Sequence, residues 1–236
     1  NHSIVDAAAL AIYSPAGIVV HTGDFKVDYT PVYGDAIDLQ RFAELGKKGV
    51  LALMCDSTNA ERQGFTPSEK KLGPVFDMLF EEHKKTRIII ATFASNVDRV
   101  QQIINTADKF GRKVVVEGRS MVNIIETASN LNRISIPENA VIDIERLKNY
   151  PKDKTVIITT GSQGESMAAL SRMASGMHKK ISIGKGDTVI FSSNPIPGNE
   201  KAVTKVINEL FKKGADVIFQ DTHVSGHACQ EEIKLI

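Results

Sequence analysis

The chain has 236 residues, of which 42% are hydrophobic and 24% are charged, and its formal net charge is +1. This length and composition predict a soluble globular protein with one large or two ordinary domains. The near-neutral charge excludes a uniformly polycationic surface, so a nucleic-acid partner would need a local groove. No apolar run reaches membrane-spanning length, and Cys55 and Cys229 lie far apart with no CxxC pair. These features predict a cytoplasmic protein with no membrane partner and no disulfide scaffold.

The first predicted element is a β-hairpin. Apolar segments at 7–13 and 18–22 flank a Ser-Pro-Ala-Gly turn, a pattern typical of two antiparallel strands. In such a hairpin His2 and Asp24 fall near the same open end. We therefore consider them jointly as metal ligands, because the ligands of one ion must converge. His21 is a weaker candidate, since strand alternation points it away from Asp24.

From residue 50 onward, short apolar runs alternate with amphipathic stretches. The runs are Val50–Cys55, Arg87–Thr92, Lys113–Glu117, Thr155–Thr159, Thr188–Phe191 and Asp216–Phe219. This alternation predicts a parallel sheet with helices on its faces. Thr66 to Glu69 match a capping box, Ser95 or Asn96 can cap the next helix, and 140–144 is strand-like.

Polar loops follow most of these strands. They include Asp56–Asn59, Phe93–Asn96, Gly118–Ser120, Thr160–Glu165, Ser192–Pro195 and Thr222–His227. Each one alone is explained as well by ordinary helix caps and turns. Together they favour a phosphate-lined cleft at the carboxyl edge of the sheet.

The loop from His223 to His227 carries the strongest chemical signal. An imidazole can protonate a leaving oxygen, while the Ser225 hydroxyl and the Gly226 N–H can bind phosphate oxygens. The alternatives are an ordinary turn and a zinc-binding histidine pair on a helix, which the intervening Ser-Gly makes doubtful. Asp56 ends an apolar strand, where its carboxylate can accept from a metal-bound histidine or cap the next turn.

These motifs resemble those of the ribonuclease J family, in the β-CASP branch of the metallo-β-lactamase superfamily. The matching segments are His2–Asp6, His21–Lys26, Asp56–Ala60, Gly64–Glu69, Phe93–Asn96, Thr160–Glu165, Ser192–Glu200 and His223–Ala228. The resemblance implies an α/β chain with a partial metallo-β-lactamase (αββα) fold and an inserted Rossmann-like β-CASP domain with a mostly parallel sheet. The implied domains are 1–69, the second part of the metallo-β-lactamase domain; 70–219, the β-CASP domain; and 220–236, the return.

The resemblance also implies roles for individual residues. His2 would be a metal ligand, and Asp24 would bridge two zinc ions. Asp56 would be the acidic residue of the first β-CASP motif and His227 the histidine of the second, acting as general acid. RNA would be bound by Phe93, Ala94 and Ser95 and by His223, Val224, Ser225, Gly226 and His227.

The implied activity is that of a zinc-dependent ribonuclease, a 5′–3′ exonuclease with endonuclease activity in mRNA decay and rRNA maturation. Its expected substrate is single-stranded RNA with a 5′-monophosphate, and its expected assembly is a homo-oligomer or a hetero-oligomer with a paralogue. The family's HxHxDH motif and third β-CASP histidine are not in the sequence. We therefore expect a central excerpt that holds zinc poorly and is inactive by itself. Two alternatives stay open: a non-catalytic β-CASP subunit, and a doubly wound domain that binds a phosphorylated metabolite.

Overall fold

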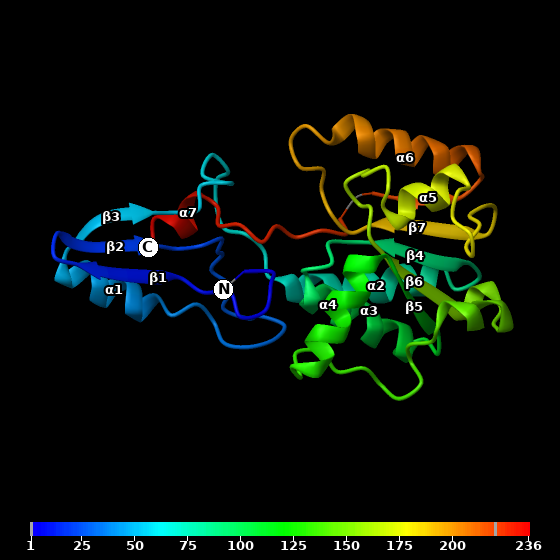
Figure 1. The fold of residues 1–236 in the computed structure, drawn as a ribbon, viewed down its shortest axis with the longest axis horizontal. Coiled ribbons are helices and arrows are strands. Elements are labelled where there is room, and N and C mark those ends of the chain that lie inside the picture. Colours follow the sequence, from blue (N-terminus) through cyan, green and yellow to red (C-terminus); the bar gives the residue numbers. More distant parts are fainter. Residues whose placement is uncertain (1, 220) are drawn as a thin grey trace. The chain divides into compact units, whose positions relative to one another are not determined.

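The computed structural model describes residues 2–219 and 221–236, which form two compact units (Figure 1). The first unit comprises the residues up to Lys71 together with Val224–Ile236, and the second comprises Leu72–His223. The predicted domains 1–69, 70–219 and 220–236 stay a prediction, and residue 220 lies outside the described residues. Among those residues, no helix combines the length and apolar character needed to span a bilayer.

The first unit is built on a small sheet. Its elements are β1 (Leu10–Ser14), β2 (Gly17–His21), α1 (Leu39–Lys48), β3 (Val50–Met54), the 3-10 turn Glu69–Lys71 and α7 (Gln230–Ile233). In the described part of this unit the strand order is β1-β2-β3. β1 and β2 are antiparallel, with Leu10 opposite His21, which confirms the predicted hairpin. β2 and β3 are parallel, so both strands end at the same edge.

One face of this sheet packs against α1. Ile18, Val20 and Leu45 form the buried cluster there. Large apolar side chains remain exposed elsewhere on the strands, at Leu10, Ile12, Leu51 and Leu53. A second cluster, Phe25, Val27 and Ala228, joins the segment after β2 to the C-terminal segment. The Ala228 N–H donates to the Phe25 carbonyl over 2.6 Å, so the two segments run side by side.

The second unit is a doubly wound α/β domain. Its strands are β4 (Arg87–Ala91), β5 (Lys113–Glu117), β6 (Thr155–Thr159), β7 (Asp187–Phe191) and β8 (Asp216–Ile218). Its helices are α2 (Leu72–Glu82), α3 (Val97–Lys109), α4 (Arg119–Asn130), α5 (Ala169–Ser175) and α6 (Glu200–Lys212), with 3-10 turns at Ile144–Asn149 and Lys152–Lys154. Within the described residues the strand order is β5-β6-β4-β7-β8, and every pairing is parallel. This confirms the predicted Rossmann-like sheet.

Burial on both faces explains why these strands are continuous apolar runs. Ile89, Ile157 and Val189 pack with residues of α5 and α6. The residues next to these in the strands, such as Ile88 and Ile90, point to the opposite face, because successive strand side chains alternate. All of them are fully buried, and each such burial contributes about 1.5–3 kcal/mol.

The helix starts agree only in part with the predictions. Asn96 caps α3, since its side chain accepts from the Arg99 N–H over 3.0 Å, as predicted. The predicted capping box at Thr66–Glu69 is wrong: the Thr66 hydroxyl donates to the His227 carbonyl over 2.7 Å, and α2 begins only at Leu72. The strand-like segment 140–144 makes a single described bridge, from Val141 to Val114, before a 3-10 turn begins.

Candidate active site

The small sheet of the first unit places two aspartates at one edge. Asp24 follows β2 and Asp56 follows β3, and these strands are parallel neighbours. The Thr22 N–H donates to the Met54 carbonyl over 3.0 Å, and the Asp56 N–H donates to the Thr22 hydroxyl over 3.0 Å. The pairing therefore continues past the strand ends and fixes both loops.

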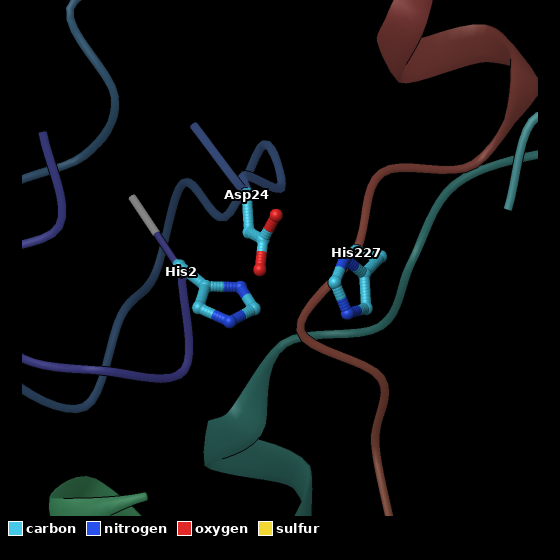
Figure 2. A group of neighbouring side chains, drawn as sticks. All are labelled: His2, Asp24 and His227. Atoms are coloured by element: carbon cyan, nitrogen blue, oxygen red, sulfur yellow. The ribbon is translucent and has the colours of Figure 1, made fainter. Parts of the chain in front are cut away.

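His2, Asp24 and His227 converge on one space. One donor atom from each lies within 4.8 Å of the others. Figure 2 shows the three side chains approaching from the N-terminal segment, the loop after β2 and the C-terminal segment. The His2 and His227 rings are 5.1 Å apart between centroids. The structure thus brings the two predicted metal ligands together, and adds to them the histidine predicted as general acid.

Hydrogen bonds define which ring nitrogens face this space. His2 Nδ1 is 2.6 Å from the Gly226 carbonyl, and His227 Nδ1 is 2.8 Å from Asp56 Oδ2. A carbonyl and a carboxylate only accept, so each Nδ1 carries a proton, and in the neutral form of each ring Nε2 keeps a lone pair that can bind a metal. Metal-binding histidines are usually oriented by a hydrogen bond from the ring nitrogen that does not bind the metal.

Hydrogen bonds hold the Asp56 carboxylate in place and favour its ionised form. Burial acts to raise its pKa, but hydrogen bonds from the Thr58 N–H and from His227 outweigh burial, so the pKa of Asp56 is lowered. The Thr58 N–H donates to Oδ1 over 3.0 Å and the Phe25 N–H to Oδ2 over 3.3 Å. Asp56 therefore both caps the next turn and orients His227.

The cluster is favourable to a cation. Burial, chiefly, and the neighbouring His227 lower the pKa of His2 and keep its ring neutral, although its bond to Gly226 acts in the opposite direction. Two imidazoles and a carboxylate match the nitrogen and oxygen donors of catalytic zinc sites. A cavity of about 460 Å³ also borders Asp24, but its lining includes neither His2 nor His227. The fit to zinc therefore depends on the three converging side chains and not on that cavity.

The loop before His227 is held by groups that sequence analysis did not single out. The Asn59 amide, which is buried, donates to the Ser225 hydroxyl over 2.9 Å and to the His227 carbonyl over 3.1 Å. The buried Lys26 ammonium donates to the Ser225 carbonyl over 3.4 Å. Both residues lie in segments that resemble motifs of the family, but nothing in the sequence indicated that their side chains hold this loop.

Glu232 is a further missed residue. It is fully buried, and its carboxylate accepts from the N–H groups of Val27, Thr66 and Cys229 over 2.7, 2.6 and 2.8 Å. It thus links the segments that contain Val27 and Thr66 to Cys229, which follows the His227 loop. Its contact with Cys229 is the local half of a capping box at the start of α7, whereas its contacts with Val27 and Thr66 join residues more than 160 positions apart and leave no local pattern.

The other predicted RNA-binding residues are distributed between the units. Val224, Ser225, Gly226 and His227 belong to the first unit, with the metal cluster. Phe93, Ala94, Ser95 and His223 belong to the second. Phe93 and Ala94 are half-buried and Ser95 is exposed, in the loop between β4 and α3. Their role in RNA binding stays a prediction.

Replacing Gly226 by alanine should disturb the metal cluster. An added Cβ would lie 2.5 Å from His2 Cε1 and 2.8 Å from His2 Nδ1, and would also strike the Ser3 hydroxyl. The His2 ring would have to move and lose its bond to the Gly226 carbonyl. We expect a clear fall in zinc affinity, measured by competition with a chromophoric chelator.

The matched control is Gly46→Ala in α1, where a Cβ meets nothing within 4 Å. Helix propensity should make that change neutral or stabilising by up to about 1 kcal/mol. Equal zinc affinity in both variants would show that the close approach of Gly226 to His2 does not matter for the metal.

The chain is similar to a known protein family and to individual known proteins. The family described as "Ribonuclease J, beta-CASP domain" matches residues 85–210, more than half of the chain. The chain is 50% identical to Ribonuclease J of Synechocystis sp. and 49% identical to Ribonuclease J of Helicobacter pylori, in each case over 100% of the chain. It is 44% identical to Ribonuclease J2 of Bacillus subtilis, also over 100% of the chain. The chain spans 37%, 34% and 42% of the lengths of these proteins.

A solved structure has the same fold. A protein of unknown function from Enterococcus faecalis aligns with a TM-score of 0.64 over 100% of this chain and 54% of its own, at 18% identity. That likeness concerns the fold alone. The match of more than half of the chain to the family, together with the parallel α/β domain at those residues, shows that the chain belongs to the ribonuclease J family and carries its β-CASP domain.

Proposed function

We propose that the protein containing this chain is a zinc-dependent ribonuclease that hydrolyses RNA phosphodiesters. The observation that carries the proposal is the convergence of His2, Asp24 and His227 within 4.8 Å in a member of the ribonuclease J family. His2 and Asp24 are the residues that would hold the metal, His2 through its imidazole and Asp24 through its carboxylate. Zinc in such a site activates water and stabilises negative charge at phosphorus.

His227 is assigned to proton transfer. Its Nδ1–H is held by Asp56 Oδ2 over 2.8 Å, and its side chain is 27% exposed, whereas that of Asp56 is 2% exposed. When the ring is doubly protonated, its Nε2 proton would pass to the departing sugar oxygen, and the Asp56 carboxylate would stabilise the charged ring before the transfer. Asp56 acts here through His227 by fixing its orientation.

Ser225 is assigned to phosphate binding. Its hydroxyl oxygen accepts from the Asn59 amide over 2.9 Å and from the His227 N–H over 3.2 Å. A hydroxyl has two lone pairs and one hydrogen, so these two bonds leave its O–H to donate. An anionic oxygen is the natural acceptor for that hydrogen, and this supports the assignment of the loop to RNA phosphate.

The finer activity is proposed as 5′–3′ exonuclease action with endonuclease activity, in mRNA decay and rRNA maturation in the cytoplasm. The test uses the purified full-length protein and single-stranded RNA with a 5′-monophosphate. We expect hydrolysis that a chelator stops and added zinc restores, with mononucleotides as the main product and less product from 5′-hydroxyl RNA.

Internal cuts in circular RNA would report the endonuclease activity. Tight RNA binding without hydrolysis by the zinc-loaded protein would contradict the proposal and favour a non-catalytic subunit. The predicted homo- or hetero-oligomer stays a prediction.

A further inference from the structure

The amino edge of the parallel sheet, where the strands of the second unit begin, concentrates positive charge. The segments that lead into these strands are 83–86, 110–112, 150–154, 176–186 and 213–215. They contain nine lysines and arginines and a single acidic residue, Asp153. The segments that leave the strands at the carboxyl edge contain no lysine or arginine, at 92–96, 118, 160–168, 192–199 and 219–223. The two edges of this sheet therefore differ in charge.

A lysine lies at the entrance to each strand of this sheet. In the order β5-β6-β4-β7-β8, these residues are Lys113, Lys154, Lys85, Lys185 and Lys213. Neighbouring strands start in register, since Lys113 is opposite Thr155 and Arg87 is opposite Asp187. Neighbouring strands lie about 4.8 Å apart, so five of them extend the row over about 19 Å.

Part of this charge is neutralised within the fold. Three of the lysines pair with carboxylates, in Lys84–Glu81, Lys152–Asp187 and Lys180–Glu145. Four others are exposed and form no ion pair among the described residues: Lys85, Lys154, Lys179 and Lys185. We call these four the amino-edge lysines. Their ammonium groups are available to an anion from outside the fold.

Helix polarity does not account for the amino-edge lysines. The negative end of a helix dipole favours cations, but this effect is confined to the last turn. Lys109 and Lys212 lie in such turns of α3 and α6. Lys85 lies beyond the end of α2, and Lys185 lies well beyond the end of α5. Unpaired lysines gathered on one edge repel one another, and an anionic partner would relieve that repulsion.

The aromatic side chains of these segments indicate which polyanion fits. Phe110 packs against Phe80, with 5.7 Å between the ring centroids, and Tyr150 packs against the core of the second unit. Both rings are thus engaged inside the fold. Proteins that hold single-stranded nucleic acid usually add aromatic rings on which the bases stack. Double-helical RNA keeps its bases inside and presents phosphates and 2′-hydroxyls, so a row of lysines without free rings suits a duplex.

We propose that the amino-edge lysines form a second RNA-binding surface, which holds the phosphate backbone of double-helical RNA without reading its sequence. The inference rests on the proposed function only for the choice of RNA as the polyanion. The surface is separate from the Phe93–Ser95 loop, because β4, with five residues, places about 16 Å between the two edges of the sheet.

The first measurement uses the full-length protein and a blunt RNA duplex of about 16 base pairs with 5′-hydroxyl ends. Dissociation constants are measured by fluorescence anisotropy over a series of salt concentrations. Replacing all four amino-edge lysines by glutamine should weaken binding. The slope of log Kd against log salt should fall by about four, one for each lost phosphate contact.

The matched control replaces four other exposed lysines by glutamine, Lys47 and Lys48 on α1 and Lys201 and Lys205 on α6. Both variants have the same net charge, so a general loss of charge affects them equally. We expect the control to keep the affinity and slope of the wild-type protein. Equal affinity and slope in the two variants would overturn the proposal, as would absence of duplex binding by the wild-type protein.

A second measurement needs no variant. Lysines of the wild-type protein are acetylated with and without the duplex, and mass spectrometry follows each residue. We expect the duplex to protect Lys85, Lys154, Lys179 and Lys185, while the four control lysines react as before. Unchanged reactivity of the amino-edge lysines would contradict the proposal. Protection by polyglutamate and not by the duplex would also contradict it, and would assign the surface to an acidic protein.

Hydrolysis of single-stranded 5′-phosphorylated RNA by the wild-type protein reports the proposed function separately. If hydrolysis is absent but the duplex binds through the amino-edge lysines, the proposed function fails and the second RNA-binding surface stands. If hydrolysis is present and the amino-edge variant binds the duplex as the control does, only the second surface is refuted.

Discussion

Replacing Asp24 by alanine is expected to abolish RNA hydrolysis by the full-length protein and to lower its bound zinc. Asp24 contributes the carboxylate of the cluster, and its donor atom lies within 4.8 Å of those of His2 and His227. Without it, only His2 and His227 remain of this cluster, and the negative charge with which the cluster offsets the metal is lost. Zinc per chain by mass spectrometry and initial rates on 5′-phosphorylated RNA give the two readouts.

Asp24→Asn sharpens this test because it keeps the size of the side chain and removes its charge. The control is Glu44→Ala on α1, which removes a carboxylate that is 46% exposed and paired with Arg41 at the surface. Exposed pairs of this kind contribute little, so zinc content and rate should stay at the wild-type level. Undiminished zinc and turnover in Asp24→Ala would refute the assignment of Asp24 as a metal ligand.

Replacing His227 by alanine is expected to lower kcat by on the order of 10² to 10⁴, the usual contribution of a general acid, with KM little changed. The structure adds a second reading, because His227 also lies within ligand distance of His2 and Asp24. Zinc content separates the two. A general acid can be removed while zinc is retained, whereas removal of a ligand lowers zinc occupancy together with kcat.

Asp56→Asn provides the partner experiment. It keeps the shape of the side chain but weakens its hold on His227 Nδ1, so kcat should fall less than in His227→Ala. The double variant should be close to His227→Ala alone, since Asp56 acts through that ring. His83→Ala, in the second unit, should leave kcat unchanged. A change confined to KM in His227→Ala would assign His227 to binding and remove it from proton transfer.

The sheet of the second unit could be predicted from the sequence alone. Runs such as 113–117 and 155–159 match the observed β5 and β6 residue for residue. A parallel strand buried on both faces must be apolar throughout, so its signal is local and does not depend on which strand pairs with it. The hairpin of β1 and β2 could also be predicted because its signal is local: its turn and both strands lie between Leu10 and His21.

Segments whose contacts are with residues distant in sequence were predicted less accurately. Thr66 has the composition of a helix cap, yet its hydroxyl donates to the His227 carbonyl, 161 residues away. The segment 140–144 has strand-like composition, but it meets β5 at one described bridge and then turns. At Thr66 a tertiary contact competes with the local preference and wins, and such a contact leaves no trace in a short window of sequence.

The candidate site divides in the same way. Sequence determined the chemical inventory: the imidazoles, the carboxylates and the Ser-Gly loop, and by resemblance the expected roles of His2, Asp24 and His227. Only the tertiary structure decided that His227 stands beside the two other side chains and that Gly226 must lack a Cβ next to His2. The physical reason is that residue type fixes which bonds a group can form, whereas convergence of groups up to 225 positions apart depends on how the whole chain packs.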